Sequence, residues 1–72
     1  MTRQKFTPSL GVIYPNAGGG LYRCVKHSEN GVWMQNVLSG WTCLCIGTAI
    51  YDNGTIDWDY SLYGCFQHNN NP

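Results

Sequence analysis

Closely spaced turn signals constrain this chain more than any other feature of its sequence. Segments rich in glycine, asparagine and serine recur after every ~6–10 residues, which leaves too little chain between them for ordinary helices. The turn segments are residues 15–20, 28–31, 38–40 and 52–54. The intervening segments are rich in β-branched and aromatic residues, which favour strands. The sequence therefore predicts an all-β fold of about five short strands, either a small SH3-like barrel or a curled antiparallel sheet.

The expected strands occupy most of a single small β domain that spans residues 1–72. We expect residues 1–9 to form a flexible arm, residues 10–67 to fold, and residues 68–72 to be a disordered tail. The strand predictions are residues 10–14, 21–27, 32–37, 41–51, 55–60 and 64–67. Gly47 lies inside the long fourth segment, and we expect that strand to bend there.

The turn at Asn53-Gly54 predicts the register of its hairpin. A three-residue loop with Gly54 in the left-handed conformation pairs Ile50 with Ile56, and further along Thr48 with Trp58 and Ile46 with Tyr60. A two-residue loop would move the aspartates onto the apolar face, because a slip of one residue exchanges the two faces of a strand. We therefore expect the longer loop. The predicted core is Leu44, Ile46, Ile50, Ile56, Trp58 and Tyr60, joined by Val25, Trp33 and Phe66.

Size and charge restrict what such a domain does. The 72 residues carry four basic and four acidic side chains and no formal net charge. Four cations are too few for general nucleic-acid binding, which relies on many phosphate contacts. No apolar run approaches the ~18 residues of a membrane-spanning helix, so we expect no membrane partner. A short chain buries more apolar surface when it associates with a second copy. A neutral chain also has little charge repulsion to prevent this association, so we expect a homo-oligomer.

Four cysteines leave three interpretations open. The sequence begins with Met and a polar segment without an apolar export signal, so we expect a cytoplasmic protein with reduced thiols. Buried free thiols that act as small apolar side chains are then the expected state, with no cofactor and no metal. A zinc site would draw on Cys24-x-x-His27, Cys43-x-Cys45 and Cys65-x-x-His68. In an oxidising compartment, a Cys43–Cys65 or Cys24–Cys45 disulfide would form instead.

Catalysis has little basis in the sequence. Asp57 and Asp59 share one strand face about 7 Å apart, a spacing that resembles a carboxylate pair. A chain of this length has little room for a substrate cleft with a supporting shell of residues. We therefore expect no enzyme, and we interpret both aspartates as surface groups of the hairpin.

Two resemblances accompany this interpretation. The long bent strand, the tight hairpin, the Ile56-x-Trp58-x-Tyr60 strand and the short last strand resemble an SH3-like barrel over roughly residues 21–67. The peptide-binding motifs of true SH3 domains are absent, so proline-rich peptide binding is not implied. Gly40-Trp41 and the run Asp-x-Gly-x-Ile-x-Trp-Asp-Tyr-Ser at residues 52–61 resemble uncharacterised small proteins of bacteria and their phages.

Binding remains as the expected activity. The outward side of the hairpin should present aromatic and acidic groups around a shallow groove with Gly47 and Ala49 at its floor. We predict a non-enzymatic module that binds a protein partner there, as an accessory or inhibitor protein of a phage or mobile element would. The alternatives are a small-molecule or nucleotide-binding oligomer with a pocket between subunits, and a zinc-stabilised β domain. The predicted binding residues are Trp41, Tyr51, Asp57, Asp59 and Tyr63.

Overall fold

A computed structural model describes the backbone of residues 2–67 and the side chains of residues 2–62. This part of the chain contains eight strands and no helix, which confirms the all-β prediction. The predicted tail, residues 68–72, lies outside the described residues. The strands are β1 (Arg3–Lys5), β2 (Ile13–Pro15), β3 (Leu21–His27), β4 (Val32–Asn36), β5 (Trp41–Ile46), β6 (Ala49–Tyr51), β7 (Ile56–Asp57) and β8 (Tyr60–Gln67).

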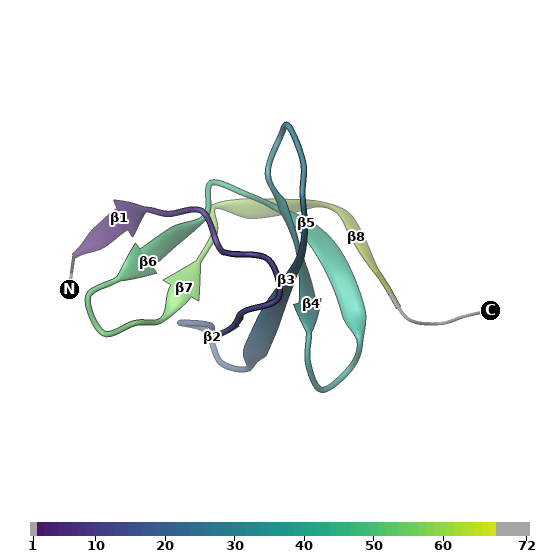
Figure 1. Ribbon diagram of the computed structural model, residues 1–72, viewed down its shortest axis with the longest axis horizontal. Helices are drawn as coiled ribbons and strands as arrows, with labels where there is room; N and C mark the ends of the chain where they lie inside the picture. The colour runs from purple at the N-terminus through teal and green to yellow at the C-terminus, as the bar shows by residue number, and fades with distance from the viewer. Residues whose placement is uncertain (1, 68–72) are drawn as a thin grey trace.

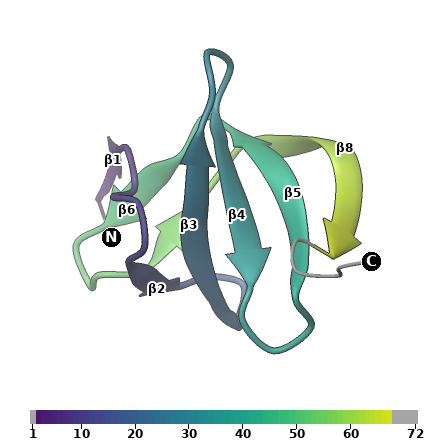
Figure 2. The same ribbon diagram turned by 45° about the vertical axis from the view of Figure 1, so that its right-hand side comes forward.

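The strands form two antiparallel sheets that lie side by side (Figures 1 and 2). A three-stranded sheet has the order β1-β6-β7, and a five-stranded sheet has the order β2-β3-β4-β5-β8. Three connections pass from one sheet to the other, namely β1 to β2, β5 to β6, and β7 to β8. One isolated parallel bridge, between Asn16 and Ile56, also joins them. The sheets are not closed into a barrel.

The predicted strands and the observed ones agree best in the middle of the chain. β3 has the predicted bounds, and β4 ends one residue earlier than predicted. The segment 41–51 is divided at Gly47 and Thr48 into β5 and β6. The last strand is longer than predicted because β8 begins at Tyr60. The structure also places a strand, β1, in the segment expected to be a flexible arm, where it pairs with β6.

The β6–β7 hairpin has the predicted register. Ile50 pairs with Ile56, and Ile46 pairs with Tyr60 further along. Gly54 has φ of 90°, the conformation that the three-residue loop requires. The Tyr51 amide donates to the carbonyl of Thr55 at 2.8 Å and closes the loop. A glycine in the left-handed conformation therefore fixes which side chains of this hairpin lie opposite one another.

The main core lies on one face of the central strands and is rich in sulfur. Its cluster of buried residues is Cys24, Val32, Met34, Cys43, Cys45 and Ile56. Aromatic side chains pack around this cluster, and Tyr22 meets Trp58 edge to face with ring centroids 5.1 Å apart. Small buried thiols allow the strands to curve closely around a few large side chains, which suits a chain of this size.

The predicted core is partly wrong. Leu44 and Ile56 are buried as predicted, and most of the other predicted members are half-buried: Val25, Trp33, Ile46, Ile50 and Trp58. Tyr60 is 54% exposed and does not belong to the core. The side chain of Phe66 lies outside the described residues.

The physical reason is an exchange of faces at Gly47. On β5 the odd-numbered Cys43 and Cys45 belong to the main core, whereas on β6 the even-numbered Ile50 packs against it. In a single uninterrupted strand, all even-numbered side chains project to one face and all odd-numbered side chains to the other. Gly47, with φ of 76°, breaks that alternation. Leu44 is therefore buried without belonging to the main core cluster.

Asp59 and Arg3 hold the bend at Gly47. The Asp59 amide donates to the carbonyl of Ile46 at 2.9 Å, so the two kinked segments are joined at this point. The guanidinium of Arg3 donates to the Asp59 carboxylate at 2.9 Å and to the Gly47 carbonyl at 3.5 Å. A Cβ atom on Gly47 would meet the Asp59 carboxylate. This position therefore needs glycine for its conformation and for its lack of a side chain.

We predict that Gly47→Ala destabilises the protein more than Gly54→Ala. Both replacements place a side chain at positive φ, but a Cβ on Gly54 meets nothing within 4 Å. Gly54→Ala should cost about 1 kcal/mol of the free energy of unfolding from backbone conformation alone. Gly47→Ala should cost about 2–3 kcal/mol, because Asp59 must also move. Urea denaturation of both variants measures this, and equal losses would show that Asp59 does not restrict Gly47.

Candidate functional site

The N-terminal segment forms one wall of the candidate site because hydrogen bonds hold it across the molecule. The Phe6 amide donates to the carbonyl of Thr48 at 3.1 Å, and the Thr48 hydroxyl donates to the carbonyl of Phe6 at 2.7 Å. The next anchor is Pro8, which is buried and whose carbonyl lies 2.7 Å from Nε2 of His27. The Cys24 thiol donates to the same carbonyl at 3.7 Å. The segment is thereby fixed to β3 and to the start of β6.

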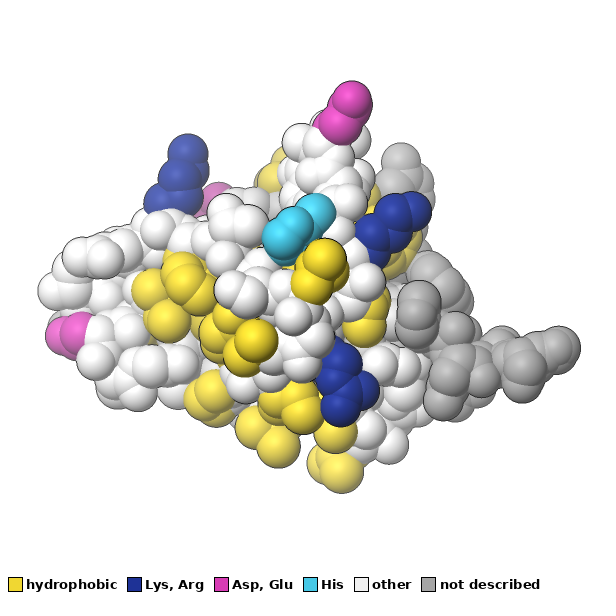
Figure 3. Space-filling view, in the orientation of Figure 1, with side chains coloured by type: hydrophobic (Ala, Val, Ile, Leu, Met, Phe, Trp, Pro, Cys, Tyr) yellow, Lys and Arg dark blue, Asp and Glu magenta, His cyan; other side chains and the backbone are white. Residues whose placement is uncertain are grey.

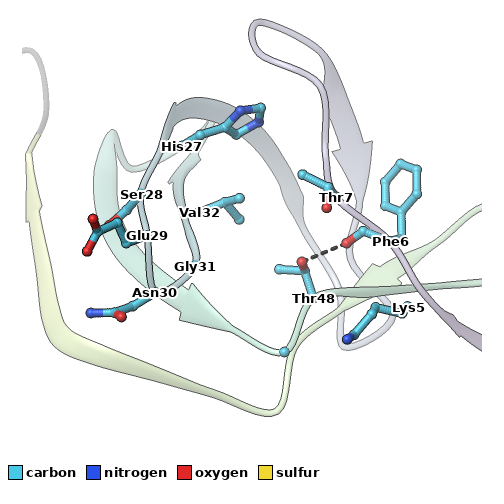
Figure 4. A pocket seen from close by; sticks show the side chains of 11 residues that line it. Lys5, Phe6, Thr7, His27, Ser28, Glu29, Asn30, Gly31, Val32 and Thr48 are labelled. Atoms are coloured by element: carbon cyan, nitrogen blue, oxygen red, sulfur yellow. Dashed lines mark hydrogen bonds between the residues drawn. The ribbon is translucent and has the colours of Figure 1, made fainter.

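A cleft of about 450 Å³ opens between this N-terminal segment and the turn that joins β3 to β4 (Figure 4). Val32 and Thr48 point toward its interior, whereas Glu29 and Asn30 point outward from the turn. Gly31 lies at the inner side of the turn, where a Cβ would meet the carbonyl oxygen of Cys45. The cleft is lined by Lys5, Phe6, Thr7, His27, Ser28, Glu29, Asn30, Gly31, Val32, Gly47 and Thr48.

A second hollow of about 200 Å³ adjoins this cleft. It is lined by Arg3, Lys5, Gly47, Thr48, Ala49 and Asp59, so the two hollows share Lys5, Gly47 and Thr48. We call the two together the β1 groove. The sequence predicts a shallow groove over Gly47 and Ala49, and the second hollow lies at that place. Its described walls carry the cations of β1 instead of the aromatic side chains that were expected.

The β1 groove offers charges of both signs. The Arg3–Asp59 ion pair lies at one end, and its side chains are 39% and 55% exposed. The hydrogen bond to Asp59 raises the pKa of Arg3, so this guanidinium stays charged. Exposed Lys5 lines both hollows, and exposed Glu29 belongs to the turn on the opposite wall of the cleft. The groove can therefore receive a ligand with both donors and acceptors along its length.

The predicted binding residues do not form one continuous face. Tyr51 and Asp57 are half-buried on β6 and β7, and Asp59 lies just before β8. Trp41 is 44% exposed at the start of β5, at the end of that strand remote from the β6–β7 hairpin (Figures 1 and 2). The side chain of Tyr63 lies outside the described residues. Of the four predicted residues whose side chains are described, Asp59 alone lines the β1 groove.

The two aspartates of the hairpin have local partners. The Asp57 carboxylate accepts a hydrogen bond from the Trp58 amide at 2.8 Å, and Asp59 is paired with Arg3. Their different partners give them different roles in the fold. A matched pair of catalytic carboxylates would need both groups to face one shared substrate site.

Sequence reasoning missed the contribution of the N-terminal segment. Lys5, Phe6 and Thr7 line the cleft, although the segment was expected to be flexible. The available signal was the apolar pair Phe6 and Pro8 within a polar stretch. His27 was considered as a metal ligand, and here its Nε2 atom contacts the Pro8 carbonyl.

Cys24, Cys43 and Cys45 are buried, and the Cys24–Cys45 disulfide is not formed. The Cys43–Cys65 alternative involves a side chain outside the described residues. Among the described side chains, those of residues 2–62, no group of three or more His, Cys, Asp or Glu is placed to hold a metal ion. The zinc alternative also involves His68 and the Cys65 side chain, which lie outside the described residues.

Comparisons with known proteins place no constraint on this site. No family model, curated protein or solved structure matches the chain. Within the described part of the chain, no helix has the length and apolar character needed to cross a membrane.

We predict that Cys24 makes the protein less stable at high pH. Burial raises the pKa of this thiol above its ordinary value of 9.0, so above pH 9 the unfolded chain loses this proton more readily than the folded protein does. The free energy of unfolding must then fall as the pH rises. Between pH 7 and pH 10, the urea midpoint should fall further in the native sequence than in Cys24→Ala. Equal falls in the two proteins would contradict the assignment to Cys24.

Proposed function

We propose that the protein is a non-enzymatic binding module whose β1 groove receives an extended segment of a partner protein. The observation that carries the proposal is the continuity of the groove, because its two hollows share Lys5, Gly47 and Thr48. An elongated site suits a chain segment better than a compact ligand, which usually fills an enclosed pocket. Extended peptides commonly bind beside strand edges, where backbone groups give affinity and side-chain pockets give specificity.

The charges of the β1 groove support a polar segment as its ligand. Lys5 would attract a carboxylate, and Glu29 would attract a cation on the opposite wall. Thr7 and Thr48, which line the same cleft, contribute hydroxyl groups. A segment with alternating charge and short polar side chains would satisfy these groups. The four basic residues of the whole chain make a phosphate backbone a poorer ligand.

The partners of the groove's titratable groups support a role without catalysis. His27 is the residue in the cleft best suited to proton transfer, and its Nε2 atom lies 2.7 Å from the Pro8 carbonyl. Asp59 is held by Arg3. These contacts fix the walls of the groove, which a binding site needs. A hydrolytic centre would instead need a base directed at a nucleophile.

Lys5→Glu should weaken peptide binding, with Lys26→Glu as its matched control. Immobilised protein would first select ligands from a library of random peptides. Lys5→Glu should lower the affinity of the selected peptides by at least about tenfold, or about 1.4 kcal/mol. Lys26 is exposed on β3 and lines neither hollow, so Lys26→Glu should leave the affinity unchanged. Fluorescence anisotropy with labelled peptides measures both.

Two results of this experiment would contradict the proposal. One is a library that yields no ligand for the native protein, and the other is an equal loss in both lysine variants. A parallel thermal-shift screen against nucleotides and sugars tests the small-molecule alternative, since a ligand that binds the native state raises Tm.

Self-association is a second proposal, and exposed aliphatic side chains support it. Leu10, Val12, Ile13 and Leu21 are between 42% and 58% exposed around β2 and the start of β3. Hydrophobic side chains gather on the face of the molecule shown in Figure 3. Because β2 is an edge strand of the five-stranded sheet, a second copy would cover apolar surface and a sheet edge together.

We therefore predict that Ile13→Lys shifts the protein toward the monomer. The substitution removes apolar surface from the edge strand and places a cation there, which a second copy would have to bury. Tyr60→Lys is the control, because it replaces a similarly exposed apolar residue at the start of β8. Light scattering after size exclusion measures the mass. A native protein that is monomeric at all concentrations would contradict this proposal.

A further inference from the structure

β1 forms a free edge of the three-stranded sheet. The strand order is β1-β6-β7, so β1 pairs with β6 on one side and with no described strand on the other (Figure 1). All of its residues, Arg3, Gln4 and Lys5, are exposed. A free strand edge presents backbone donors and acceptors with which another strand can pair. At this edge a segment of a partner can therefore extend the sheet.

The register of β1 and β6 determines which backbone groups of β1 face outward. The Phe6 amide donates to the carbonyl of Thr48 at 3.1 Å, so Phe6 directs its amide toward β6. Opposite residues of an antiparallel pair alternate between hydrogen-bonded and non-hydrogen-bonded pairs. Gln4, two residues earlier, therefore also faces β6 with its amide and carbonyl. The backbone groups of Arg3 and Lys5 face away from β6 and supply donors and acceptors at the free edge.

The side chains of Arg3 and Lys5 place cations beside the same edge. They project to one face because they are two residues apart on one strand, and both line the second hollow of the β1 groove. Arg3 is paired with Asp59, whereas Lys5 has no ion pair among the described residues. Directly paired residues of neighbouring strands project to the same face. A strand added to β1 therefore brings alternate side chains to these cations.

The cations also determine which kind of strand fits. If two copies of β1 paired antiparallel through their outward groups, each cation would lie opposite another cation. Like charges directly opposite one another destabilise a sheet, and charged side chains on an edge strand commonly prevent such pairing. A strand with acidic side chains reverses the sign of this interaction. Charge complementarity therefore favours an acidic partner segment over a second copy of this chain.

We propose that β1 receives an acidic strand of a partner protein, which extends the three-stranded sheet by one strand. The inference rests on the proposed function, because it names how the ligand of the β1 groove binds. The outward amides of Arg3 and Lys5 donate to carbonyls of the added strand, and their carbonyls accept from its amides. Its carboxylates lie opposite the two cations, at positions separated by one residue. The backbone bonds supply affinity, and the carboxylates supply specificity.

Two substitutions of Lys5 separate its backbone donor from its charge. Lys5→Gln removes the cation and keeps the amide proton, whereas Lys5→Pro removes both. Proline is tolerated on an edge strand where its nitrogen faces away from the neighbouring strand, so both variants should fold. Lys5→Pro should bind the peptides selected from the random library at least about fivefold more weakly than Lys5→Gln, because it lacks one hydrogen bond. Equal affinities of the two variants would overturn the inference.

Amide hydrogen exchange of the native full-length protein, measured by NMR, requires no variant. We expect the selected peptides to share two acidic residues separated by one residue. At saturation they should slow exchange of the Arg3 and Lys5 amides by at least about tenfold, because a new hydrogen bond protects each of them. The Gln4 amide is the internal control, since it already faces β6 and should change less.

The outcomes of the exchange measurement distinguish this inference from the proposed function. Peptides that bind without protecting the Arg3 and Lys5 amides would overturn the added strand and leave the β1 groove as a peptide site. Selected peptides without the acidic pattern would also overturn it. A library that yields no ligand would contradict both proposals.

Discussion

The structure depends on the junction that Gly47, Asp59 and Arg3 form. Here the chain leaves the five-stranded sheet between β5 and β6, and it returns to that sheet between β7 and β8. Gly47 supplies the backbone conformation and leaves the space that the Asp59 carboxylate occupies. Arg3 then joins β1 to both. The same contacts that make the chain change direction therefore also shape one end of the β1 groove.

Local turn chemistry made part of the fold predictable. Gly54 and the alternation around it were sufficient for the register of the β6–β7 hairpin, because one glycine conformation allows one pairing. The position of the bend at Gly47 was also visible in the sequence. The exchange of the strand's two faces at this bend was not visible in the sequence, because it depends on Asp59 and Arg3, which are distant in sequence. The wrong assignment of Tyr60 to the core follows from that single missing rotation.

The candidate site was predictable to a smaller extent. The small residues Gly47 and Ala49 indicated a hollow, and the structure has one there. The wall that Phe6 and Pro8 help to form depends on hydrogen bonds between backbone groups, which leave little trace in residue type. Trp41 and Asp59 could be recognised as exposed groups, but they lie at opposite ends of the β5–β8 pairing, in which Trp41 pairs with Gln67 and Ile46 with Tyr60.

The pairing of β1 with β6 also affects how the protein is made. Arg3 and Asp59 are 56 positions apart, so β1 leaves the ribosome long before the residues that hold it. Contacts between such distant parts of a chain form slowly because a long loop must close first. During synthesis the β3–β4 hairpin can form early. The wall of the groove that contains β1 can form only after β6 and Asp59 have emerged from the ribosome. A nascent chain would therefore form the β3–β4 hairpin before it completes this wall of its binding surface.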